Sequence, residues 1–287
     1  MRSSFLPTLF LGATTWCAIA QSVAAIDCFK DGQELRNAVI QFTGDGCSDD
    51  NNCNNDIVQK YGWPIGTWCV SEVTNMEAIF YTRSSFDDDI SKWNVSAVND
   101  MSWMFHGAEL FNRDLSSWDV SSVTTMFSMF EDAATFNQDL SSWDVSSVTN
   151  MRDMFRDALL FNQDLSSWDV SSVKDMGWMF ANTNSFNRDL SSWDVSSLTD
   201  TSDMFAGAKA FNQDLCSWGT KLPKNENIAA EMFPGSGCTY TTTDFEAGGP
   251  FCASTCGVSG ASSVSTVSGC VATLLSVFLV NLFLLAH

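Results

Sequence analysis

The feature that most constrains this chain is a repeat of 25 residues that fills 86–210. Each unit opens on a phenylalanine, has a tryptophan seven residues later and closes on a Met-Phe pair. A period between about 20 and 50 residues predicts a stack of similar units. Because one unit is too short to bury these residues alone, the units must share a core. The opening residues are Phe86, Phe111, Phe136, Phe161, Phe186 and Phe211, and the tryptophans are Trp93, Trp118, Trp143, Trp168, Trp193 and Trp218.

Each unit contains two stretches with different patterns. In the first, 114–120 of one unit, β-branched and aromatic residues mix with small polar ones, which predicts a short strand. In the second, Val123, Met126, Met129 and Phe130 have the spacing of one helix face. We therefore expect an α/β repeat solenoid of about seven units, on the order of 35 Å long, with a curved sheet face. The residues placed to cap the helices are Asn99, Thr124, Thr149 and Thr199.

Asparagine and aspartate also recur once per unit. Turn residues of this kind bond nearby backbone N–H groups, so one hypothesis is a structural ladder of side chains. The other is a stripe of carboxylates that binds Ca²⁺, whose preferred ligands are oxygens. The asparagines are Asn112, Asn137, Asn162, Asn187 and Asn212, and the candidate calcium ligands are Asp114, Asp139, Asp164 and Asp189.

Units that read Phe-Asn-Gln-Asp-Leu-Ser-Ser-Trp-Asp-Val-Ser-Ser-Val-Thr-Asn-Met resemble the BspA-like family of leucine-rich-repeat surface proteins. The resemblance covers about 61–233. It implies a leucine-rich-repeat-like horseshoe or slab that is displayed outside the cell and used for adhesion or recognition. Phenylalanine, tryptophan and methionine stand here in place of the leucines of ordinary repeats.

Residues 1–25 have the features of a secretory signal peptide. Arg2 precedes an apolar stretch, and small residues close the segment at Ala24 and Ala25. A membrane-spanning helix is the alternative, but Pro7 and Gly12 interrupt an apolar stretch that is short for a span. We therefore expect the mature protein to be secreted.

Segments without the regular repeat flank the stack on both sides. We expect 26–60 to form an N-terminal cap with a short helix within 32–42, 61–235 to form the stack, and 236–258 to form a C-terminal cap and stalk. Four cysteines near each end fit two disulfide-stapled caps, each with three possible pairings. With only two histidines in the chain, a zinc site at these cysteines is disfavoured. The cysteines are Cys28, Cys47, Cys53, Cys69, Cys216, Cys238, Cys252 and Cys256.

The C-terminal segment 259–287 combines small residues, an uncharged spacer and a short apolar tail, which is the layout of a GPI-attachment signal. Ser259 is the expected attachment site, with Gly257 and Gly260 as alternatives. A retained membrane helix is the other interpretation. The single Asn-x-Ser/Thr sequon begins at Asn94 and predicts a solvent-facing glycosylated asparagine.

Charge and motifs exclude several function classes. The formal net charge of −20 argues against nucleic acid and anionic lipid as partners. The sequence has no phosphate-binding glycine loop, HExxH or GxSxG motif. His106 stands at a position that varies between units, which predicts an exposed surface histidine. We therefore predict that the protein is not an enzyme.

Together these features predict a cell-surface adhesion or recognition protein, anchored to the outer leaflet of the plasma membrane, that binds an extracellular protein or glycan. The alternative is an acidic structural protein of the cell surface or wall that binds Ca²⁺ and no specific protein ligand. No other cofactor is expected. Residues that differ between otherwise identical units are the ligand-binding candidates. The first set is Arg113, Gln138, Gln163, Arg188 and Gln213, and the second is Glu109, Thr135, Leu160, Ser185 and Ala210.

Overall fold

The computed structural model describes residues 28–47, 53–223, 232–239 and 252. Four helices lie within these residues: α1 (Gly32–Gly44), α2 (Asp56–Tyr61) and the 3-10 helices η1 (Ile65–Thr67) and η2 (Cys216–Thr220). None of the helices in the described part of the chain is both long and apolar enough to cross a membrane. The predicted signal peptide and GPI-attachment segment lie outside the described residues.

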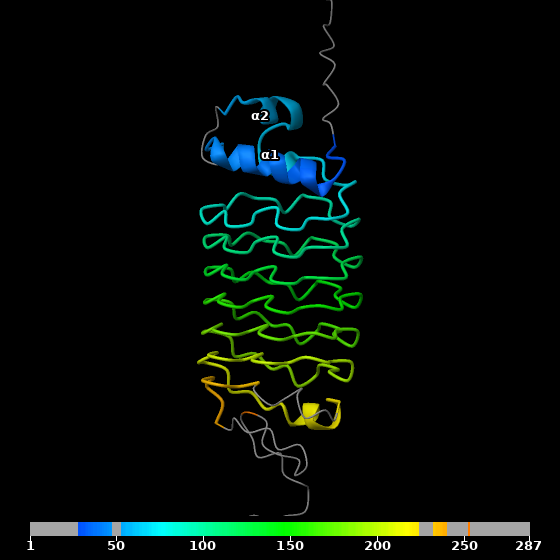
Figure 1. Cartoon of the computed structure of the whole chain (residues 1–287), viewed down its shortest axis with the longest axis vertical. Coiled ribbons are helices and arrows are strands. Elements are labelled where there is room, and N and C mark those ends of the chain that lie inside the picture. Colours follow the sequence, from blue (N-terminus) through cyan, green and yellow to red (C-terminus); the bar gives the residue numbers. More distant parts are fainter. Residues whose placement is uncertain (1–27, 48–52, 224–231, 240–251, 253–287) are drawn as a thin grey trace, which may run out of the picture.

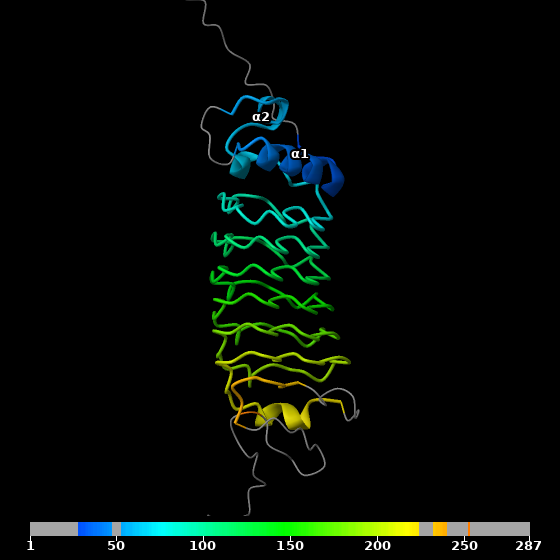
Figure 2. The ribbon, with the colours of Figure 1, turned by 60° about the vertical axis from the view of Figure 1, so that its left-hand side comes forward.

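The repeat units lie one above another along the longest axis of the molecule, each forming one rung (Figure 1). Helices α1 and α2 lie at the N-terminal end of this stack, and η2 lies at the opposite end. The view turned by 60° shows the rungs in the same straight arrangement (Figure 2). Residues 25 positions apart in the sequence are therefore neighbours in space, and we call each such series of equivalent residues a column.

Helix α1 covers the first rung. It begins where the predicted helix begins and ends two residues later, and Asp31 caps its N-terminus, where the side chain accepts the N–H of Glu34. Leu35, Val39 and Phe42 form its buried face. On the side toward the stack, the guanidinium of Arg36 donates to the backbone carbonyl of Glu77, which has no rung above it. The helix thus closes the apolar end of the stack and supplies a donor for a carbonyl of the first rung.

The strand predicted at 114–120 is wrong, because a turn at 116–117 interrupts that stretch and a second turn follows directly at 121–122. Oδ1 of Asp114 accepts the N–H of Ser116, and Oδ1 of Asp119 accepts the N–H of Ser121. Each bond bends the backbone within three residues, so an extended run cannot form. Among the described residues, the rungs of the stack are joined by isolated parallel β-bridges and by no longer strand pairing. These join Asn75, Asp100, Thr125, Asn150, Asp175 and Asp200. The predicted curved sheet face is therefore wrong as well.

The helix predicted around 123–130 is also wrong. The N–H groups of Met126, Ser128 and Phe130 donate to backbone carbonyls of the next rung, each over 2.9 Å, and not to carbonyls of their own rung as in a helix. This direction is possible because the backbone is left-handed at two positions of the unit, four residues apart, with φ of 51° at Ser128 and 58° at Asp132. The apolar spacing resembles a helix because both arrangements bring every third or fourth side chain to one side.

The residues predicted as helix caps bond between rungs instead. Both the N–H and the hydroxyl of Thr124 donate to the carbonyl of Asn99, over 2.9 and 3.0 Å. Thr149 donates in the same way to Thr124. The threonines therefore form a ladder along the stack.

The core consists of columns of aromatic rings and methionines that run through all rungs. Phe105, Phe130 and Phe155 are buried, with ring centroids 5.3 and 5.7 Å apart. The buried indole of Trp143 donates from Nε1 to the carbonyl of Leu115 in the preceding rung, over 3.0 Å. The shared core that the repeat predicts is therefore present across the described units.

Disulfides occur at both ends of the stack, as predicted. Cys28 pairs with Cys69 and Cys47 with Cys53 near the N-terminal helices, and Cys238 pairs with Cys252 at the other end. Cys216 is disulfide-bonded as well. Cys256 lies outside the described residues.

Candidate functional site

Each repeat unit divides into two halves that differ in how much they vary. We call 111–123 and its equivalents in the next three units, which begin at Phe136, Phe161 and Phe186, the constant half. Its sequence is identical in these four units apart from Arg or Gln at the third residue and Val or Leu at the last. We call 124–135 and its equivalents the variable half, because most of its residues outside the core differ between units.

Side chains of the constant half are engaged in holding the stack together. Oδ1 of Asn137 accepts the N–H of Asn162 in the next rung, over 2.9 Å, and the same arrangement repeats along the asparagine column. The candidate calcium ligands each accept the N–H of the serine two residues on, over 2.8–2.9 Å. These bonds from Ser116 and Ser166 lower the pKa of Asp114 and Asp164. The geometry is that of turn-stabilising carboxylates.

The first set of predicted ligand-binding residues also contacts the neighbouring rung. Nε2 of Gln138 donates to both the carbonyl and Oδ1 of Asn112, over 3.0 and 2.9 Å. Gln163 and Gln213 make the equivalent pairs of bonds, and Arg113 and Arg188 donate from Nε to the equivalent carbonyls. All five side chains thus act as clamps between units, a role that sequence variation alone did not reveal.

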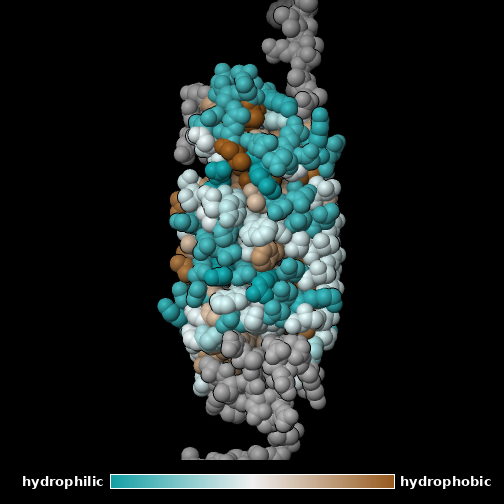
Figure 3. Space-filling model, in the orientation of Figure 1, coloured by the Kyte–Doolittle hydropathy of each residue, from teal (hydrophilic) through white to brown (hydrophobic). Residues whose placement is uncertain are grey.

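The variable half presents a different surface. Aromatic and charged side chains meet there in pairs: the rings of Tyr81 and His106 stack with centroids 4.8 Å apart, and Trp103 meets Phe127 edge-on at 4.7 Å. From residue 74 to the end of the described stack, the exposed large apolar side chains lie in this half too, and they are Tyr81, Leu110, Leu159 and Leu160. Figure 3 shows a mostly polar surface with small apolar patches along one edge of the stack.

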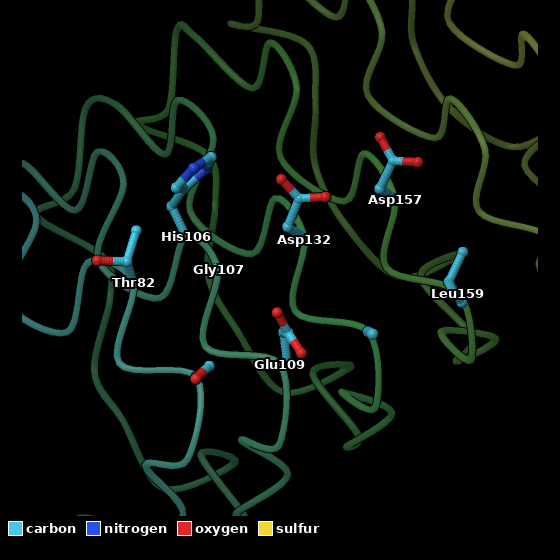
Figure 4. Close-up of a pocket in the computed structure, with 9 residues that line it drawn as sticks. Thr82, His106, Gly107, Glu109, Asp132, Asp157 and Leu159 are labelled. Carbon is cyan, nitrogen blue, oxygen red and sulfur yellow. The ribbon is translucent and has the colours of Figure 1, made fainter.

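An open groove of about 610 Å³ crosses four successive units at the end of the variable half (Figure 4). It is lined by one or more residues from each unit, so no single repeat could form it. Its polar lining includes three carboxylates, those of Glu109, Asp132 and Asp157. The residues labelled there are Thr82, His106, Gly107, Glu109, Asp132, Asp157 and Leu159.

His106 is the one histidine among the described residues, and its predicted exposure is wrong. Its side chain is only 18% exposed, and Nδ1 lies 3.3 Å from Oε2 of Glu131 in the next rung. Pairing with Glu131 raises the pKa of His106. Burial together with the charges of Asp157 and Glu131 raises the pKa of Asp132. The groove therefore joins a histidine to a crowded set of carboxylates.

Two stretches of the chain, 51–159 and 139–240, match the family described as "Mycoplasma protein of unknown function, DUF285". Together they cover about two thirds of the chain and every unit of the stack. The chain belongs to the DUF285 family. Comparison with curated proteins and with solved structures gave no match.

Within this DUF285 chain, sequence reasoning missed the grouping of His106 with Glu131 and Asp132. A usable signal was present, since a period of 25 residues places position 131 directly beside position 106. The prediction at Asn94 stays open. Asn94 is exposed and its Oδ1 accepts the N–H and hydroxyl of Ser96, over 3.2 and 2.8 Å.

Proposed function

We propose that this protein is a BspA-like recognition protein of the cell surface, whose units form a leucine-rich-repeat-like solenoid and whose variable half binds an extracellular protein or glycan. The observation that carries the proposal is the separation of the two halves of each unit. Variation is concentrated where stacking depends less on particular side chains, because backbone N–H groups there donate directly to carbonyls of the next rung, and hydroxyls such as that of Thr135 only add to these bonds.

The residues found in the variable half support a binding role. Trp103 and Trp178 occupy left-handed backbone positions, with φ of 54° and 60°, where a bulky residue costs energy. The same column holds Ser128 in another unit, so the fold does not require an aromatic ring there. Tryptophan, tyrosine and arginine dominate the binding energy of protein interfaces. Tryptophans that cost folding energy at these positions are therefore expected if this surface recognises a ligand.

The recognition face can be tested without disturbing the stack. In the double variant W103S/F127S, both serines copy residues that other units already have in these columns, namely Ser128 and Ser202. We expect the mature protein to bind members of an array of extracellular glycans or the surface of intact cells, and the double variant to bind at least tenfold more weakly at unchanged melting temperature. The control R113Q copies Gln138 on the constant half and should bind normally. Equal binding by the double variant and the wild type would contradict the proposal.

Secretion and a GPI anchor at Ser259 complete the proposal. They rest on the sequence patterns of 1–25 and 259–287. Treatment of intact cells with phosphatidylinositol-specific phospholipase C should release the protein into the medium. Retention on the cells, with the apolar tail still present by mass spectrometry, would replace the lipid anchor by a membrane helix.

A further inference from the structure

We propose that His106, Glu131 and Asp132 form a binding site for one divalent first-row transition-metal ion, for which Zn²⁺ is the probe. This site is independent of the proposed recognition function, and it differs from the cysteine and aspartate sites considered from the sequence.

The donor atoms already converge. One ring nitrogen and one oxygen from each carboxylate lie within 4.8 Å of one another. Nδ1 of His106 and Oε2 of Glu131 are 3.3 Å apart. Two ligands of a tetrahedral zinc ion, each bound at about 2.0–2.1 Å, are separated by about 3.3–3.4 Å. A metal ion would therefore need only a small movement of the third ligand.

A second observation points to a missing partner at the histidine. Nδ1 of His106 is buried and makes no hydrogen bond, because the nearby carboxylate of Glu131 lies within ion-pair distance without the direction that a hydrogen bond requires. A buried ring nitrogen without a directed partner is costly. A metal ion between the two groups would satisfy both.

Neighbouring side chains hold the ligands in place. Tyr81 stacks on the ring of His106, with 11° between the ring planes. The guanidinium of Arg156 lies 3.7 Å from Oε1 of Glu131, on the oxygen that does not face the histidine. The stacked ring restricts rotation of the imidazole, and the ion pair restricts the carboxylate of Glu131. Figure 4 shows His106 and Asp132 projecting from successive rungs to the same side, at the open groove. A water molecule can therefore reach the remaining coordination position.

The donor set selects the class of metal. Imidazole nitrogen with two carboxylates suits zinc and similar ions, whereas Ca²⁺ takes six to eight oxygen ligands. The histidine column holds Tyr81, Arg156, Ala181 and Ala206 in other units, which cannot repeat the site. Among the described residues this is the one group of three such ligands, so we expect one strong site per chain.

The test is calorimetric titration of the purified full-length protein with ZnCl2 after removal of metals. Wild-type protein should bind one Zn²⁺ more tightly than Ca²⁺. H106A copies Ala181 and D132N copies Asn182, so both replacements are already tolerated in their columns. Each should weaken Zn²⁺ binding at least tenfold. The control D119N copies Asn94, removes one carboxylate from the constant half and should leave the affinity unchanged.

A spectroscopic measurement separates a specific site from general attraction to an acidic surface. Co²⁺ bound by histidine and carboxylates in tetrahedral geometry gives visible absorption bands, which should be present in wild type and D119N and lost in H106A. Zn²⁺ binding that is equal in wild type, H106A and D132N would overturn the proposal. So would the absence of any Zn²⁺ binding, or a Co²⁺ spectrum that does not change in H106A.

Discussion

The constant and variable halves of each unit both bond to the neighbouring rungs, but they use different groups to do so. In the constant half, side chains make the bonds between rungs, as when Asn137 accepts from Asn162 and Trp143 donates to Leu115. In the variable half, backbone N–H groups such as that of Ser128 reach the next rung directly. Outside the core, this chain therefore keeps its sequence nearly constant only where side chains make the bonds between rungs. The other half is free to acquire binding residues.

The largest expected effect on stability comes from a comparison of two tryptophans of one unit. Trp168, in the constant half, is 4% exposed and donates to the carbonyl of Leu140 over 2.9 Å. W168A should destabilise the protein by about 3–5 kcal/mol, because it leaves a cavity in the shared core. W178A, in the variable half, removes the contact of the indole with Arg156 and should cost about 1 kcal/mol or less. Denaturant midpoints measure both, and similar losses would contradict the division into halves.

The second comparison concerns one hydrogen-bonding residue from each half. N137A removes the acceptor for the N–H of Asn162 and for the amide of Gln163. Leaving the N–H of Asn162 unpaired should cost about 1–2 kcal/mol, while the amide of Gln163 keeps its bond to the backbone carbonyl of residue 137. T135A removes one exposed hydroxyl bond to Glu109 in a column where Ala210 already occurs. It should change stability by no more than about 0.5 kcal/mol. A larger loss of stability in T135A than in N137A would contradict the conclusion that side chains of the constant half contribute more to stacking.

The third prediction is a gain of stability at a left-handed position. Thr82 has φ of 54°, and its column contains Gly107 and Gly207. T82G should stabilise the protein by up to about 1 kcal/mol, because it relieves strain at a β-branched residue and loses only part of that gain to chain entropy. Thr149 has no such strain and donates its hydroxyl to Thr124, so T149G should destabilise. Thermal melting of the two variants gives the comparison.

Much of the arrangement follows from the sequence, because burial depends on residue type and period. The columns that contain Phe130, Trp143 and Met154 are buried, and α1 and the disulfides are near the ends of the stack. The secondary structure within a rung cannot be predicted from the sequence in the same way, because the spacing of apolar residues shows only which side chains share a face. It does not report whether backbone groups bond within the segment, as in a helix, or to the next rung, as at Ser128.

The candidate site shows a second limit. Sequence variation at the column of His106 predicted exposure, since variable positions are usually solvent-facing. The environment of His106 instead depends on Tyr81 in the rung before it and Glu131 in the rung after it. In a stack, each side chain must be read with its neighbours 25 residues away on both sides. The clamp role of Gln138 escaped prediction for the same reason.

The smallest expected effect uses pH to compare the carboxylates of the two halves. In one unit, bonds from Ser171 lower the pKa of Asp169, in the constant half, below its usual 3.8. In the same unit, burial raises the pKa of Asp175, in the variable half, above 3.8 despite its contact with Arg152. Asparagine occurs in both columns, as Asn94 and Asn150, and accepts the equivalent backbone N–H bond in each. D169N and D175N therefore change the charge and keep the turn.

The two variants should shift the melting temperature in opposite directions at pH 7. The stabilising contribution of ionised Asp169 is present above pH 3.8 and is lost as the pH falls through its lower folded pKa, so D169N should melt slightly lower than wild type. The burial penalty of ionised Asp175 is absent below pH 3.8 and complete above its higher folded pKa, so D175N should melt slightly higher. Both differences should shrink as the pH is lowered to about 3. Shifts of the same sign at pH 7 would mean that the variable half, like the constant half, depends on its side-chain charges for stacking.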